Sequence, residues 1–326
     1  MPSTTDTTDL GRLLDRAAGA LGPTDPGLAA ELTARATLAH EPPDPFDALT
    51  GDPVVDNYRT FGYLVLRGFF DPDLVAALRG EMRAALLAVH GEDSLRRPPP
   101  GGGMAVHEAC LLGPWAPRTV DLVDSRALVG LAERLVGDVV LPSPADTQAK
   151  LYLDTAPWHH DIGILVRAVK FVAYLEPLDG ATGALRVLPA SHRLPDGALA
   201  HLYSLDVDVP DVPAQVLASE PGDLIAFDPL LWHATCGGGS PRHQWSTLYV
   251  RDASIPRWRD GLIAWFADGT SDLARLPEGH RPFDPRWVGE GGMDAEQRFD
   301  QRHRWMFRFH RLGVLDAYGV TAAFTG

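Results

Sequence analysis

The chain is organised around Trp158-His159-His160-Asp161, taken together with the later segment Trp232-His233. Side chains two residues apart on an extended strand point to the same face, so His159 and Asp161 are expected to grip one metal ion from one side. His233, on a distant strand, is the predicted third ligand. Two histidines and one carboxylate form the facial set typical of non-heme Fe(II) oxygenase sites, with three adjacent positions left open.

A His-x-Asp pattern by itself is weak, because the chain contains 12 histidines. The context strengthens it, since both proposed histidines follow a tryptophan and lie beside predicted strands, at 147–154 and 223–227. The side chain of His160 should face away from the metal, as a core or supporting residue. His192, in Ser191-His192-Arg193, is interpreted as part of a structural turn and not as a ligand.

Composition limits the classes of partner. The net charge of -14 argues against a nucleic-acid or anionic-membrane surface, because both would repel an acidic protein. Cys110 and Cys236 provide no disulfide framework, and we find neither a secretory signal nor an apolar run long enough to span a bilayer, so a cytoplasmic protein is expected. Lys150 and Lys170 are the only lysines among 29 basic residues, an arginine bias typical of GC-rich bacterial genomes.

Short apolar runs separated by turn residues dominate the middle of the chain. Strands at this spacing predict an antiparallel sandwich or barrel. The predicted strands are 63–66, 149–153, 164–175, 185–188, 216–217, 224–227 and 245–250.

Helices are predicted around this core by periodicity and capping residues. Two should lie between residues 10 and 39, before a proline-rich loop at 41–53. A helix over 74–89 should start at the cap Asp71 and Pro72, and a helix over 125–136 should run from the cap Ser125 to Gly137. Residues 96–103 are expected to form a loop, which is either a lid or a plain connector.

Several pieces in order carry a resemblance to a known family. They are residues 58–69, 158–161, 179–185, 189–192, 221–227 and 232–233. Over residues 58–250 the chain resembles the phytanoyl-CoA dioxygenase (PhyH-like) family of Fe(II)- and 2-oxoglutarate-dependent oxygenases. The resemblance implies a mainly β fold with flanking helices, built on a double-stranded β-helix (jelly-roll, cupin-like) core. It also implies one oxygenase domain over 1–326, with a helical cap at 1–55, the core at 56–255 and an extension at 256–326.

The family also implies an arginine, shortly after the second histidine, that holds the far carboxylate of 2-oxoglutarate. Arg242 matches it, with Arg251 and Arg186 as alternatives, and a guanidinium fork suits a carboxylate. Gln148 is similar to a cosubstrate-contacting amide of relatives. Many relatives carry a lysine just before the metal motif. That contact is either absent here or moved to Lys150.

The resemblance therefore implies a dioxygenase with Fe(II) as cofactor and 2-oxoglutarate and dioxygen as cosubstrates. The expected reaction is hydroxylation of an unactivated C–H bond in a small metabolite, with release of succinate and CO2. The composition and the family together indicate bacterial specialised metabolism. Halogenation is disfavoured because Asp161 fills the position that a halide would need. Desaturation, cyclisation and epimerisation stay open, as do the substrate and the oligomeric state.

A zinc-type hydrolase and a non-catalytic metabolite-binding barrel are the alternatives from other classes. Candidate pocket residues lie at 104–108, including His107, and in the aromatic C-terminal part.

Overall fold

Two antiparallel sheets face each other in the computed structural model, which describes residues 50–99, 104–111, 115–143, 146–161, 167–193, 209–237 and 241–252. The larger sheet has the order β1-β9-β6-β11-β4-β2, with β3 also beside β11. Its strands are β1 (Tyr63–Leu66), β2 (Val106–Cys110), β3 (Val140–Pro142), β4 (Gln148–Tyr152), β6 (Ala168–Tyr174), β9 (Leu224–Phe227) and β11 (Arg242–Arg251). The smaller sheet has the order β5-β10-β7-β8. Its strands are β5 (Ala156–His159), β7 (Leu185–Val187), β8 (Gln215–Leu217) and β10 (His233–Thr235). This is the expected double-stranded β-helix.

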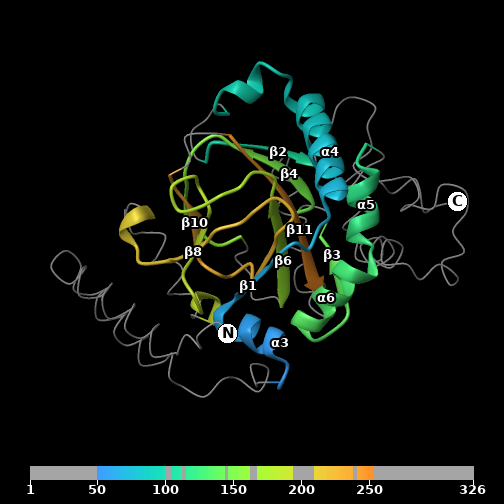
Figure 1. Cartoon of the computed structure of the whole chain (residues 1–326), viewed down its shortest axis with the longest axis vertical. Coiled ribbons are helices and arrows are strands. Elements are labelled where there is room, and N and C mark those ends of the chain that lie inside the picture. The colour runs from blue at the N-terminus through green and yellow to red at the C-terminus, as the bar shows by residue number, and fades with distance from the viewer. Residues whose placement is uncertain are drawn as a thin grey trace, which may run out of the picture.

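Helices cover the outer face of the larger sheet. In Figure 1, α4 (Pro72–His90), α5 (Pro117–Val123) and α6 (Arg126–Val136) lie on the side away from β8 and β10, and α3 (Pro53–Phe61) lies at the bottom of the view. One apolar core fills the space between these helices and the larger sheet, and a second lies between the two sheets. Short 3-10 turns complete the elements, at η2 (Ser94–Arg96), η3 (Ser191–Arg193) and η4 (Val209–Asp211).

Strand alternation divides the side chains of β11 between these two environments. Trp245 and Tyr249 point toward the helices, where Trp245 Nε1 donates to Thr119 Oγ1 (3.2 Å) and the Tyr249 hydroxyl donates to the Val123 carbonyl. Arg242 and Gln244, on the other face, point between the sheets, because Arg242 bonds to Thr235 of β10 and Gln244 bonds to the inward-facing Tyr174. The larger sheet thus supplies polar side chains to a barrel interior that is closed from behind by the helical layer.

The predicted helix starts are confirmed. Asp71 accepts from the Leu74 amide and Pro72 begins α4, while Ser125 caps α6 and Gly137 ends it in the left-handed conformation, at φ 79°. The loop prediction for 41–53 is wrong at its end: Asp52 accepts from the Val54 amide, so that Pro53 begins α3. The predicted loop at 96–103 begins on the last residue of η2.

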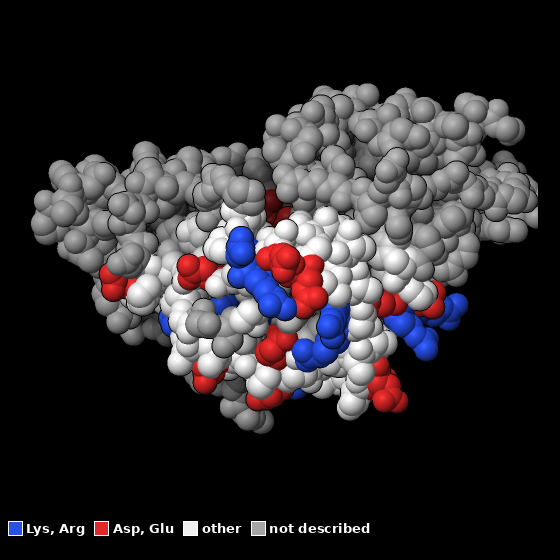
Figure 2. Space-filling model, turned by 90° about the horizontal axis from the view of Figure 1, so that it is seen from above, with Lys and Arg blue, Asp and Glu red and all other residues white. Residues whose placement is uncertain are grey.

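The predicted strands are present in the described residues, but that set lacks β2, β3, β5 and β10, and the helices α3 and α5 were not predicted. The expected N-terminal helices at 10–39, most of the 41–53 loop and the extension at 256–326 lie outside the described residues, so the division into cap, core and extension stays a prediction. Among the described helices, none combines the length and apolarity needed to cross a membrane. Figure 2 shows acidic and basic side chains interspersed over the described part of one face.

Candidate functional site

His159 and His233 lie side by side inside the barrel. They come from the antiparallel neighbours β5 and β10, whose register places the two residues directly opposite each other. Cross-strand partners lie close enough for their side chains to touch, and the two imidazole centroids are 4.2 Å apart. The pairing of two distant segments therefore brings the predicted histidines together.

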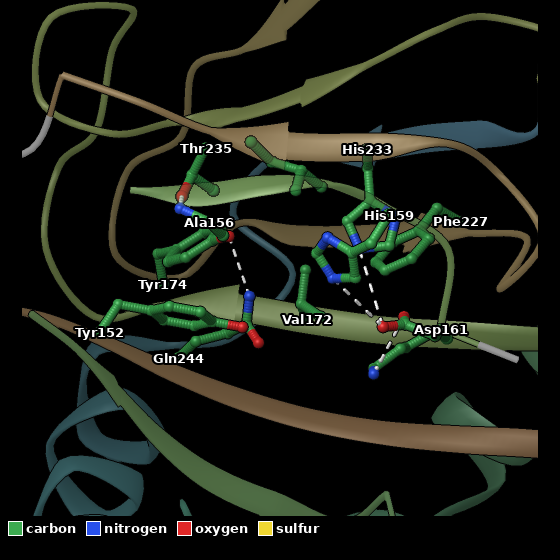
Figure 3. A pocket seen from close by; sticks show the side chains of 12 residues that line it. Tyr152, Ala156, His159, Asp161, Val172, Tyr174, Phe227, His233, Thr235 and Gln244 are labelled. Carbon is green, nitrogen blue, oxygen red and sulfur yellow. Dashed lines mark hydrogen bonds and ion pairs between the residues drawn. The ribbon is translucent and has the colours of Figure 1, made fainter. Parts of the chain in front are cut away.

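Asp161 completes the cluster in a way that the sequence did not predict. β5 ends at His159, and the chain bends at Asp161, whose amide donates to the Pro229 carbonyl (2.9 Å). The expectation that His159 and Asp161 share one face of a single extended strand is therefore wrong. The bend nevertheless turns the carboxylate toward both rings (Figure 3), and ligand atoms of the three residues lie within 4.8 Å of one another.

The protonation of the two histidines leaves a lone pair on each facing nitrogen. Nδ1 of His159 donates to the Pro157 carbonyl and Nδ1 of His233 to the Leu231 carbonyl, both at 2.8 Å, because a carbonyl oxygen can only accept. Burial lowers the pKa of His159, and burial together with the nearby His159 lowers the pKa of His233 to about 3, so both rings are neutral near pH 7. Their Nε2 atoms face Asp161 Oδ1 at 3.8 and 3.7 Å, which is too long for hydrogen bonds. Three acceptors that converge without a proton between them fit a shared metal ion.

Asp161 stays ionised although it is enclosed. Burial by itself raises the pKa of its carboxyl group, but the Lys170 ammonium, followed by the two imidazoles, outweighs burial and holds the pKa well below its usual range. Lys170 Nζ lies 3.0 Å from Asp161 Oδ2 and 4.0 Å from Asp146 Oδ1. The carboxylate is therefore available as a ligand at neutral pH.

The cluster opens into a small cavity between the sheets. Figure 3 shows His233, Phe227 and Asp161 at one end and Tyr152, Tyr174, Gln244 and Thr235 at the other. The lining residues are Tyr152, Ala156, His159, Asp161, Lys170, Val172, Tyr174, Leu185, Phe227, His233, Thr235 and Gln244. A molecule in this cavity would meet the histidine–carboxylate cluster with one end and hydroxyl and amide groups with the other.

Arg242 is buried beside that second end. Its Nη2 donates to the Asp154 carbonyl (2.6 Å) and to Thr235 Oγ1 (3.2 Å), and its guanidinium lies 5.6 Å from the centroid of the Tyr152 ring. Gly183, at φ 98°, makes room for it, because a Cβ atom there would lie 2.7 Å from Arg242 Cδ. Arg242 does not itself line the cavity, but its guanidinium lies behind the lining residues Thr235 and Tyr152, which are at the end opposite Asp161.

Comparison with known proteins agrees with this geometry. The family described as phytanoyl-CoA dioxygenase (PhyH) matches residues 58–243, which is more than half of the chain. The chain belongs to the phytanoyl-CoA dioxygenase family. As a member of this family it is a dioxygenase enzyme, with Fe(II) as cofactor and 2-oxoglutarate as cosubstrate. No curated protein matches the sequence.

Several solved structures have a similar fold, and three of them are described here. AviO1 from Streptomyces viridochromogenes Tue57 is 24% identical, with a TM-score of 0.46 over 62% of this chain and 96% of that chain. The epimerase SnoN from nogalamycin biosynthesis is 19% identical (TM-score 0.47, covering 60% and 80%). EctD from S. alaskensis with 2-oxoglutarate and 5-hydroxyectoine is 21% identical (TM-score 0.48, covering 65% and 79%).

The other candidates from the sequence lie in different environments of the dioxygenase fold. Gln148 is buried on β4 but is not one of the residues that line the cavity, and Lys150 forms an ion pair with Glu108 (2.7 Å). Arg186 donates to the Gly180 carbonyl and Arg251 pairs with Asp138, so neither reaches the cavity through these bonds.

Three histidines outside the cluster have places of their own. His107 does not line the cavity. Its Nε2 donates a hydrogen bond to the Arg97 carbonyl, and its ring packs against His90 at the end of α4. His192 forms part of η3, and its Nε2 donates a hydrogen bond to the Arg59 carbonyl. The interpretation of His192 as part of a structural turn is confirmed. His160 does not line the cavity either.

Sequence reasoning missed Lys170, Tyr152, Tyr174, Gln244 and Thr235. Lys170 carried a signal that could have found it, because it is one of only two lysines and stands within the apolar run 168–174. A charged residue at a fully buried strand position is costly unless it is paired, which makes it a candidate site residue. The tyrosines, Gln244 and Thr235 carried no such signal, since these residue types are common in strands.

Proposed function

We propose that this dioxygenase hydroxylates a C–H bond of a small metabolite, with His159, Asp161 and His233 as the iron ligands. The observation that carries the proposal is the convergence of two imidazole lone pairs on one oxygen of Asp161, at 3.8 and 3.7 Å. Two histidines and one carboxylate are the ligand set of non-heme Fe(II) oxygenases. Both histidines are oriented by a carbonyl acceptor, as metal-binding imidazoles usually are.

We assign the far end of the cavity to the distal carboxylate of 2-oxoglutarate. Arg242 is the cation at that end, and Thr235, Tyr152 and Tyr174 supply hydroxyl groups beside it. A guanidinium can donate two parallel hydrogen bonds to a carboxylate. In this proposal 2-oxoglutarate spans the cavity, with its distal carboxylate on Arg242 and its other end at the histidine–carboxylate cluster.

The ionic groups described inside the barrel support a dianionic cosubstrate. Three cations balance three carboxylates there, namely Lys150, Lys170 and Arg242 against Glu108, Asp146 and Asp161. A divalent metal ion would add two positive charges to this balanced interior. A dicarboxylate restores neutrality, and uncompensated buried charge is strongly unfavourable.

When bound, Fe(II) would supply, together with 2-oxoglutarate and dioxygen, the oxidising chemistry that converts C–H to C–OH, with one oxygen atom of O2 entering the product and the other entering succinate as CO2 is released. The residues of this chain bind, orient and exclude water. His159 and His233 stay neutral near pH 7, so no proton has to leave before they bind a cation. Phe227, Val172 and Leu185 provide apolar walls between the two polar ends.

Hydroxylation is the simplest outcome of this arrangement, while epimerisation, desaturation or ring formation differ from it only in how the substrate is placed. The arginine-rich composition supports a bacterial source and the family supports a small metabolite, so we assign the protein to bacterial specialised metabolism. Succinate release with a panel of candidate metabolites identifies the substrate, and mass analysis of the product distinguishes addition of oxygen from loss of hydrogen.

The proposal is tested by an anaerobic titration of the metal-free protein with Fe(II) and then 2-oxoglutarate. We expect the weak visible charge-transfer band of the chelate in the wild type and its loss in His159→Ala, Asp161→Ala and His233→Ala. His90→Ala, at the end of α4 and outside the barrel, is the matched control and should keep the band. Iron binding without the band would refute the cosubstrate assignment and favour a metal-dependent hydrolase. A band that survives in His233→Ala would refute the ligand set.

A further inference from the structure

Lys170 is a buried lysine on the inner face of β6. The adjacent side chains Val169 and Phe171 pack toward the helical layer, and Lys170 itself is 3% exposed. A buried ion pair costs desolvation free energy, and an apolar side chain of similar volume is often at least as stabilising. Packing therefore gives no reason for an ammonium group at this position. The reason lies in its ion-pair partner, Asp161.

The two oxygens of Asp161 face different partners. Oδ2 lies 3.0 Å from Lys170 Nζ, whereas Oδ1 lies 3.8 and 3.7 Å from Nε2 of His159 and His233. Figure 3 shows both rings on the Oδ1 side of the carboxylate. Asp146 Oδ1 lies 4.0 Å from the same Nζ atom. The contact with Lys170 is an ion pair without hydrogen-bond geometry, and it sets the ammonium against the oxygen that would otherwise be available to the metal as a second ligand atom.

We propose that Lys170 is a positioning residue that restricts Asp161 to one metal-binding oxygen and places a positive charge beside the metal, weakening metal binding and strengthening binding of the anionic cosubstrate. This inference rests on the proposed function, in which Asp161 is an iron ligand. A carboxylate that binds through one oxygen leaves three of six positions open beside two histidines, and one that binds through both leaves two.

The charge of Lys170 acts on the two ligands in opposite directions. It repels a divalent cation and attracts a dicarboxylate. At an effective dielectric constant near 20, the interaction free energy of two unit charges a few ångströms apart corresponds to a change of far more than tenfold in a binding constant. Removing the ammonium should therefore tighten metal binding at least tenfold and weaken 2-oxoglutarate binding at least tenfold. Damage to the fold alone would weaken both.

Co(II) is the probe, because its d–d absorption reports the coordination number of the site. The test variants are Lys170→Met, which removes the ammonium alone, and Lys170→Met/Asp146→Asn, which also removes the carboxylate 4.0 Å from it and so keeps the net charge. The matched control is Lys150→Met/Glu108→Gln, which removes the other buried lysine and its partner from the same barrel. Each protein is titrated with Co(II), and the loaded protein is then titrated with 2-oxoglutarate under argon.

We expect both Lys170 variants to show a changed d–d spectrum, and Lys170→Met to show a lower Kd for Co(II) and a higher Kd for 2-oxoglutarate, while the control keeps the wild-type d–d spectrum and Kd for Co(II). A wild-type spectrum with unchanged affinities in Lys170→Met would overturn the inference and leave the proposed function intact. Weaker binding of both ligands, or failure of both variants to fold, would also overturn it, because Lys170 would then serve the fold. Absence of Co(II) binding by the wild type would instead refute the proposed function.

Discussion

Replacement of Arg242 by lysine separates the charge of this residue from its shape. The guanidinium is fixed by bonds from Nη2 to the Asp154 carbonyl and Thr235 Oγ1, and by the Tyr152 ring beneath it. Lysine keeps the positive charge but loses the planar fork, so it can offer the distal carboxylate of 2-oxoglutarate only one directed hydrogen bond in place of two. A charge-assisted hydrogen bond contributes about 1.5–3 kcal/mol. The Kd for 2-oxoglutarate should accordingly rise about ten- to a hundredfold.

The assay is the anaerobic titration of Fe(II)-loaded protein with 2-oxoglutarate, followed at the charge-transfer band. Affinity for Fe(II) itself should not change in Arg242→Lys, because Arg242 lies at the opposite end of the cavity from Asp161. Arg186→Lys is the matched control. That arginine lies on β7 and donates to the Gly180 carbonyl, so its replacement should leave both affinities at the wild-type value.

An unchanged Kd for 2-oxoglutarate in a folded Arg242→Lys protein would refute the assignment of the distal carboxylate to Arg242. A proportional loss of Fe(II) affinity would refute the separation of the two ends. Near-ultraviolet circular dichroism checks the fold, since Tyr152 and Trp245 lie close to the substituted side chain or on its strand.

Two further predictions concern neighbouring features of the fold. Gly183→Ala should weaken 2-oxoglutarate binding, as Arg242→Lys does, because the Cβ atom of alanine would displace Arg242. It should also lower the free energy of unfolding by about 1–2 kcal/mol, because alanine is strained at φ 98°. The titration measures the Kd for 2-oxoglutarate and urea unfolding measures the stability, and an unchanged Kd would contradict the prediction. Burial lowers the pKa of His192 from 6.5 to about 4, so its contribution to stability is complete above pH 6.5 and is lost as the pH falls toward 4, by at most about 3 kcal/mol. His192→Gln should therefore flatten the dependence of unfolding free energy on pH between 7 and 4, and parallel slopes in variant and wild type would exclude this role.

Local signals in the sequence identify elements whose causes are local. Asp71-Pro72 and Ser125 with Gly137 mark helix ends because capping bonds join residues that are three or four apart. The same dipeptide at Asp52-Pro53 starts α3 in the same way, although the proline-rich composition of the residues before it indicates a loop. The cap, and not the composition of the preceding residues, determines where this helix begins.

The site depends on pairings that no local signal contains. The register of β5 against β10 sets His159 opposite His233, across more than seventy residues of sequence, and the motifs identify the two residues but not this register. Asp161 reaches the cluster through a bend that is fixed by the distant Pro229 carbonyl, and not through strand alternation. Lys170 is nine residues from Asp161 in sequence, yet its contact with Oδ2 exists only because β6 passes beneath the bend. Alternation along β6 predicts which face Lys170 occupies, and only the assembled barrel shows what that face meets. The residues that bind a ligand are thus readable from motifs, whereas those that orient the ligand atoms follow from how strands far apart in sequence are brought together.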